Sequence, residues 1–184
     1  MKKVLSLDIS SSTIGWGLIY FNNNLITFKG SGHIKPPSKA AAEKKSFGLS
    51  YRLNEIAKST QKLLTDVAPD VVIVEDYARK FSRGKSSANT IIVLATVNET
   101  VSLEVFKFLG TEAVRLPVAR IRKILRDEYG EPISDKDDII NFMAAMFSDF
   151  TPVKNKVGNT KKECFDEADA LAAGLAYCVD KLKR

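Results

Sequence analysis

The sequence predicts an α/β domain in which one five-stranded mixed sheet carries helices on both faces. Two observations lead to this prediction. Three runs rich in strand-forming residues open the chain with only short turns between them, which is typical of an antiparallel meander. A helical pattern then separates the third run from a fourth, β-branched run. A helical crossover between strands favours parallel pairing in a sheet covered on both faces.

The first half of the chain follows this scheme in order. We expect the meander strands at Lys3–Ile9, 14–21 and 25–34, with the turn "NNN" before the third. A polar connection at 35–45 follows, and helically spaced apolar residues then predict an amphipathic helix from Ser46 to Val67. The run "DVVIVED" at 70–76 is predicted to be a buried strand.

The second half is predicted to be mostly helical, and the whole of residues 1–184 is expected to form one domain without internal repeats. Ser134 with Asp137 resembles a capping box at the start of one helix. The remaining expected elements are a largely buried helix at 87–110, a short strand at 112–116, a helix from Pro117, a helix at 134–147, a polar basic loop at 151–163 and a last helix from about Cys164 to Leu182.

Composition narrows the class of protein. The chain has 184 residues, of which 45% are hydrophobic, enough for one domain with a core. It contains no apolar run long enough to span a membrane, and its start "MKKVLSLDIS" is better interpreted as a strand than as a signal peptide. The two cysteines match no metal-binding spacing, so we expect them to be reduced and the protein to be cytoplasmic. The net charge of +6 suggests, without establishing, a nucleic-acid partner.

Four carboxylates stand at positions that favour a common site. Asp8 lies inside the first strand, where aspartate is disfavoured, and Glu75 closes the fourth strand. The right-handed crossover rule places the fourth strand beside the first and parallel to it, so the two side chains are expected to meet. In "FDEADALAAG", Asp166 and Asp169 are three residues apart and share one face of the last helix.

Converging carboxylates repel each other unless cations are present. Oxygen-only ligands select hard ions such as Mg²⁺ or Mn²⁺, and two such ions about 4 Å apart are a common arrangement for phosphodiester hydrolysis. Each residue also has a structural explanation: Asp8 as a cap, Glu75 as a solvated strand end, and the helical pair as partners of the macrodipole. The neighbouring acidic residues are expected to face other directions; these are Asp76, Glu163 and Glu167.

Three segments together resemble the RuvC-type Holliday junction resolvases. They are "LDISSSTIGWGLI", "APDVVIVED" and "FDEADALAAGLAYC", with "SGHI" and "ISDKDDI" in the same order between them. The resemblance covers nearly the whole chain. It implies a ribonuclease H-like fold, a homodimer, and two-metal cleavage of four-way DNA junctions by paired nicks.

Carried over by motif, the metal ligands would be Asp8, Glu75, Asp166 and Asp169, binding two Mg²⁺ ions that Mn²⁺ could replace. Lys136 matches a family lysine near the scissile phosphate, and Arg122 matches another basic position less closely. The turn after Asp8 lacks the family's Pro-Gly, and Ala78 stands where the family often has an aromatic wedge. These departures resemble the phage-type branch, which accepts varied branched DNA.

A basic loop after Glu75 is expected to contact DNA. Cations there would bind phosphates, and an aromatic ring would stack on a base at the junction. Its candidate residues are Tyr77, Arg79, Lys80, Phe81, Arg83 and Lys85. The loop at 151–163 is either solvated or a second clamp on the DNA backbone. The apolar faces of the 87–110 helix are either core or partly an interface with a two-fold partner.

Other functions compete with this hypothesis. A nuclease acting on RNA or on an RNA–DNA hybrid would use the same metal chemistry on a phosphodiester. A sugar-kinase or actin-like fragment also begins with an aspartate and a small-residue turn, but such folds need a second domain for which this chain has no room. A non-catalytic adaptor would be expected to lack some of the carboxylates, and none is missing.

Overall fold

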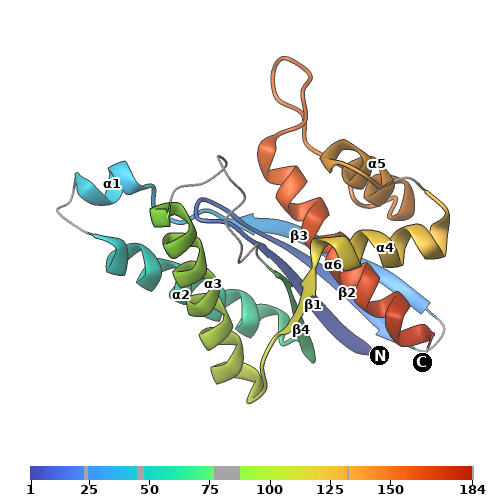
Figure 1. The fold of residues 1–184 in the computed structure, drawn as a ribbon, viewed down its shortest axis with the longest axis horizontal. Coiled ribbons are helices and arrows are strands. Elements are labelled where there is room, and N and C mark those ends of the chain that lie inside the picture. Colours follow the sequence, from blue (N-terminus) through green and yellow to red (C-terminus); the bar gives the residue numbers. More distant parts are fainter. Residues whose placement is uncertain (23–24, 45–47, 77–87, 132, 184) are drawn as a thin grey trace.

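The computed structural model describes residues 1–22, 25–44, 48–76, 88–131 and 133–183. Its centre is a five-stranded mixed sheet in the order β3-β2-β1-β4-β5 (Figure 1). The strands are β1 (Lys2–Ile9), β2 (Ile14–Asn22), β3 (Leu25–Ile34), β4 (Val71–Asp76) and β5 (Val114–Pro117). The first three pair antiparallel as a meander, whereas β4 pairs parallel with both β1 and β5. The predicted sheet, including the β1–β4 contact, is confirmed.

Helices cover both faces of the sheet, with α2 and α3 on one side and α4, α5 and α6 on the other (Figure 1). The helices are α1 (Lys39–Glu43), α2 (Leu49–Val67), α3 (Ala88–Leu109), α4 (Val118–Tyr129), α5 (Lys136–Met146) and α6 (Lys162–Leu182). α6 crosses β1, β2, β3 and β4, so this last helix is the main cover of its face.

Two hydrophobic cores explain why β1 and β4 read as nearly continuous apolar runs. Successive strand residues point to opposite faces, so Val4 and Ile73 enter the core under α6. Leu5 and Val72 enter the core under α2 and α3 instead. Because both faces are buried, the central strands cannot alternate with polar residues, and a polar side chain on them requires a specific reason.

Several expected boundaries were wrong. The connection expected at 35–45 contains the short helix α1, and α2 begins at Leu49. The cap of α5 is shifted by one residue: Asp135 accepts the N–H of Asp138, whose carboxylate accepts the N–H groups of Asp135 and Ser134. The segment expected to be a loop at 151–163 contains a hairpin and the first two residues of α6.

The structure also shows the state of the two cysteines and whether a described helix could cross a membrane. Cys164 and Cys178 are both free and buried. Within the described residues, no helix combines the length and the apolar character that crossing a membrane requires.

Candidate active site

The parallel β1–β4 register brings the first two carboxylates to one edge of the sheet. Leu7 is paired with Val74, and the next residue on each strand is Asp8 or Glu75. Both strands run in the same direction, so both side chains lie where the strands end. The predicted meeting of Asp8 and Glu75 follows from this register, and each lies within the electrostatic field of the other.

The helix α6 approaches this edge closely because a glycine lies beneath it. Gly15 on β2 is the cross-strand partner of Asp8. A Cβ atom at Gly15 would lie 2.2 Å from the backbone oxygen of Asp166, so any larger residue would push the helix away. The close approach positions Asp166 and Asp169 above Asp8, with only 6% and 9% of their surfaces exposed.

Lys136 is the nearest cation to these carboxylates among the described residues. It is the first residue of α5, and its Nζ lies 3.1 Å from Oδ2 of Asp169 and 3.8 Å from Oδ1 of Asp166. Burial alone would lower the pKa of Lys136, but Asp169, Asp8 and Asp166 outweigh it and raise that pKa. Lys136 is therefore charged at neutral pH, and it neutralises only part of the negative charge around it.

The remaining negative charge contributes, together with burial, to raised pKa values of the carboxyl groups. Burial, followed by the charges of Glu75, Asp169 and Asp166, raises the pKa of Asp8 well above its ordinary value. Burial and then the charge of Asp169 raise the pKa of Glu75 to about 7, against the opposing effect of Lys136. Burial also raises the pKa of Asp166. The protein thus holds several carboxyl groups in a place where they resist ionisation.

This donor set fits a hard divalent cation in its chemistry. All four groups offer oxygen, and their mutual repulsion is what a bound cation would relieve. In the conformations present, no three described carboxylate, histidine or cysteine side chains are close enough to enclose a metal ion. A cation bound by this set would therefore have to draw the side chains inward and compete with the Lys136 ammonium.

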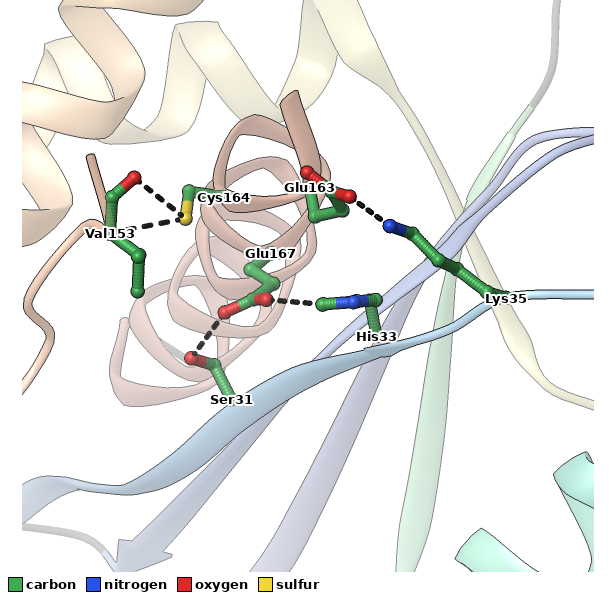
Figure 2. A network of polar contacts seen from close by, with 7 residues as sticks. All are labelled: Ser31, His33, Lys35, Val153, Glu163, Cys164 and Glu167. Atoms are coloured by element: carbon green, nitrogen blue, oxygen red, sulfur yellow. Dashed lines mark hydrogen bonds and ion pairs between the residues drawn. The ribbon is translucent and has the colours of Figure 1, made fainter. Parts of the chain in front are cut away.

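The acidic neighbours on α6 face away from the site, as expected from the sequence. Glu167 contacts β3, where Ser31 Oγ donates to Oε2 at 3.0 Å and His33 Nδ1 lies 2.8 Å from Oε1 (Figure 2). Glu163 pairs with Lys35, the residue that follows the end of β3. These contacts fix the first turns of α6 to the edge strand, a role for Glu167 that the sequence did not predict.

Two other predicted groups have different outcomes. Arg122 on α4 donates to the backbone oxygen of Ser134, just before α5, and its charge lowers the pKa of Glu75 against the dominant effect of burial. It therefore lies close to the site. The basic loop after Glu75 lies outside the described residues; its candidates were Tyr77, Arg79, Lys80, Phe81, Arg83 and Lys85.

Comparison with known proteins places this geometry in a family of folds. No protein-family model matches the chain. The crossover junction endodeoxyribonuclease RuvC of Rhodopseudomonas palustris (strain BisA53) is 33% identical over 73 residues, which are 40% of this chain. The match spans 38% of that relative's length.

The solved structures match over far more of the chain. T. thermophilus RuvC in complex with a Holliday junction substrate aligns with a TM-score of 0.68 and 14% identity, over 98% of this chain and 95% of that one. This chain has the RuvC fold. The yeast mitochondrial Holliday junction resolvase Ydc2 aligns with a TM-score of 0.59 and 12% identity, over 99% of this chain and 80% of that one.

The RuvC-like sheet confirms the fold class predicted from the sequence, and it confirms the resemblance to RuvC-type resolvases. In this RuvC-like chain, four carboxylates from β1, β4 and α6 share one electrostatic neighbourhood with Lys136. That neighbourhood is the part of the described structure best suited to chemistry on a charged substrate.

Proposed function

We propose that this protein is a metal-dependent endonuclease that resolves four-way DNA junctions by paired, symmetric nicks. The observation that carries the proposal is the group of carboxylates on a RuvC fold: the pKa values of Asp8, Glu75 and Asp166 are all raised by desolvation and by the charges of neighbouring carboxylates, near the described Lys136. A structural cap or a solvated strand end would not gather so much unrelieved negative charge.

Each residue has a role that follows from its position. Asp8, Glu75, Asp166 and Asp169 would hold divalent cations, with Mg²⁺ as the first candidate and Mn²⁺ as its substitute. Bound ions of this kind supply an activated water and stabilise the leaving oxygen in phosphodiester hydrolysis. Lys136, half-exposed beside Asp169, would bind the scissile phosphate and orient it against the carboxylate edge.

A homodimer would supply two such sites for a two-fold symmetric junction. The exposed side of α3 supports this part of the proposal. Ile92, Leu103 and Phe106 are large apolar side chains with between 50% and 62% of their surface exposed. Leu103 and Phe106 line a groove beside Arg115. In contrast, Val97 and Val101 on the same helix are buried in the core.

The test is cleavage of defined substrates by the purified protein. A synthetic four-way junction, a linear duplex and an RNA–DNA hybrid are incubated with Mg²⁺ or with EDTA. We expect paired nicks across the junction, dependence on Mg²⁺, and little cutting of the other two substrates. Preferred cutting of the hybrid would replace the proposal with an RNA-directed nuclease.

Variants of the carboxylates test the site itself. Asp169→Asn and Asp8→Asn each remove a ligand charge, and we expect them to bind the junction but to lose at least 100-fold in cleavage rate. Asp180→Asn is the matched control, because it lies on α6 outside the carboxylate group and pairs with Arg120. Normal cleavage by both Asp169→Asn and Asp8→Asn would contradict the site.

A further inference from the structure

A basic hairpin projects from the same end of α6 that carries Asp166 and Asp169 (Figure 1). It comprises residues 153–161 and is called the α6 hairpin below. Lys154 and Thr160 pair across its stem, and the N–H of Lys161 donates to the backbone oxygen of Val153 at 2.9 Å. The segment therefore has a defined shape.

The tip of the α6 hairpin is also hydrogen-bonded. The N–H of Asn155 donates to the oxygen of Asn159 at 2.7 Å, and the side chain of Asn155 accepts the N–H groups of Val157 and Asn159. Gly158 closes the turn with φ +88°, in the left-handed region where glycine is favoured. Such a turn holds its outermost side chains in a fixed direction.

The base of the α6 hairpin is tied to the catalytic helix. The N–H of Val153 donates to Sγ of the buried Cys164 at 3.3 Å (Figure 2). The Cys164 thiol in turn donates toward the backbone oxygen of Val153 at 3.8 Å. Four residues separate the start of α6 from Asp166, a rise of about 6 Å. The hairpin is thus held at a fixed position next to the proposed site.

The exposed chemistry of the α6 hairpin suits DNA. The segment from Lys154 to Lys162 contains no acidic residue and four lysines, none in an ion pair with a described acidic residue; these are Lys154, Lys156, Lys161 and Lys162. Val157, at the tip, has 83% of its surface exposed, more than any other large hydrophobic side chain in the described part of the chain. An apolar tip surrounded by lysines is unfavourable in water. It suits DNA, because the phosphates lie on the outside of the duplex and the bases lie inside it.

The shape of the hairpin limits its reach. Only its stem is extended, and from Val153 to Asn155 it spans about 7 Å at about 3.3 Å per residue. The tip is the turn from Asn155 to Asn159, which contains both Lys156 and Val157, whereas Lys154 lies in the stem. The major groove of DNA is about 12 Å wide, which admits a two-stranded ribbon of this kind.

We propose that the α6 hairpin enters the branch point of the DNA beside the cleaved strand, with its lysines on phosphates and Val157 against an opened base pair. This inference rests on the proposed junction-resolving function. The proposed wedge lies on a segment other than the one after Glu75. Cys164 connects it to α6, the helix that bears Asp166 and Asp169.

Binding in EDTA tests the lysines without cleavage. Lys154→Ala with Lys156→Ala is compared with Lys123→Ala and Lys183→Ala, which remove the same charge near the opposite end of α6. Dissociation constants for a four-way junction are measured by fluorescence anisotropy over a series of salt concentrations. We expect the hairpin pair to reduce the salt slope by about 2 and the affinity by 10- to 100-fold near 0.1 M salt. Equal slopes for the two pairs would overturn the phosphate contacts.

Fluorescence of 2-aminopurine at the branch point tests the wedge. We expect the wild-type protein to increase this fluorescence on binding, and Val157→Ala to give less than half of the increase. Val153→Ala, which removes an exposed valine at the hairpin base, should match the wild type. Equal signals from Val157→Ala and Val153→Ala would overturn the wedge. A hairpin that binds only a protein partner would leave the salt slope and the 2-aminopurine signal unchanged in the variants, and that result would also overturn the proposal.

The two proposals fail in different ways. A protein that nicks the junction with Mg²⁺ but binds it independently of the α6 hairpin retains the function and loses this inference. A protein that binds through the hairpin but never nicks retains the inference and loses the nuclease. Far-ultraviolet circular dichroism of each variant confirms that its fold is intact, as expected for exposed side chains.

Discussion

Glu75 is a residue whose protonation depends on the site around it. Burial and the charge of Asp169 raise its pKa to about 7, from an ordinary value of 4.5 that applies in the unfolded chain. The folded protein therefore binds this proton more tightly than the unfolded chain does. The associated stability is fully present below pH 4.5 and is lost as the pH rises through about 7.

The expected result in EDTA is a protein that becomes less stable as the pH rises from 5 to 8. The contribution of Glu75 to this loss is at most about 3 kcal/mol. Glu75→Gln should flatten the curve of melting temperature against pH, whereas the exposed Glu99→Gln should not. Added Mg²⁺ should raise the melting temperature more at pH 8 than at pH 5.5. A pH-independent melting temperature would contradict the charge repulsion.

Substitution of Glu167 tests whether its contact with β3 positions α6. Glu167→Ala removes the bonds to Ser31 and His33, and we expect it to cost about 1–2 kcal/mol in unfolding free energy and to lower the cleavage rate. Glu163→Ala breaks an exposed pair with Lys35 and should cost less than about 1 kcal/mol. Chemical denaturation compares the two, and equal losses would show that the Glu167 contact is an ordinary surface interaction.

At the residue scale, the sequence identified the four candidate carboxylates but not the side-chain contacts that hold α6 against the sheet. Asp8 was recognisable because aspartate is disfavoured inside a strand, Glu75 because it closes a strand expected beside the first, and the Asp166/Asp169 pair because its spacing puts both side chains on one helix face. The partners of Glu167 are 134 and 136 residues away along the chain, and no local pattern reveals such a contact. Only the strand order and register bring Glu167 to β3.

At the scale of elements, the packing of α6 on β2 determines how closely the carboxylates approach one another. Gly15→Ala would place a Cβ atom 2.2 Å from a backbone oxygen of α6, so the helix must shift. We expect a loss of about 1–3 kcal/mol in unfolding free energy and a strong loss of cleavage. Gly48→Ala, where an added Cβ meets nothing within 4 Å, is the control: it should leave cleavage unchanged and cost less than about 1 kcal/mol, because Gly48 is the N-cap of α2.

The longer elements were predicted closely, and among the short ones the strand β5 was expected at 112–116 whereas the helix α1 was missed. β1, β2, β3 and β4 were found within one residue of their bounds, because apolar runs bounded by turn residues are a strong signal. The helix α1 has only five residues, too few to show a period. The α6 hairpin depends on side-chain-to-backbone bonds of Asn155, for which "NKVGN" gave a turn signal that we interpreted only as a loop.

For the whole molecule, the expected assembly is a two-fold dimer through the exposed side of α3. Light scattering should give twice the mass of the 20.3 kDa chain at micromolar concentration. Phe106→Glu should convert the dimer to a monomer, because it places a charge in the apolar face. Val157→Glu is a suitable control, since it changes an exposed valine elsewhere. A wild-type protein of single-chain mass would contradict the dimer.

Two of the four carboxylates lie on α6, which leaves the ribosome only after every strand of the sheet has been synthesised. Asp8 and Glu75 are present early, but without α6 the growing chain has half of the proposed ligand set. If the chain is the nuclease proposed above, a partly translated copy would therefore lack the site, and cutting would begin only once α6 has packed over the sheet.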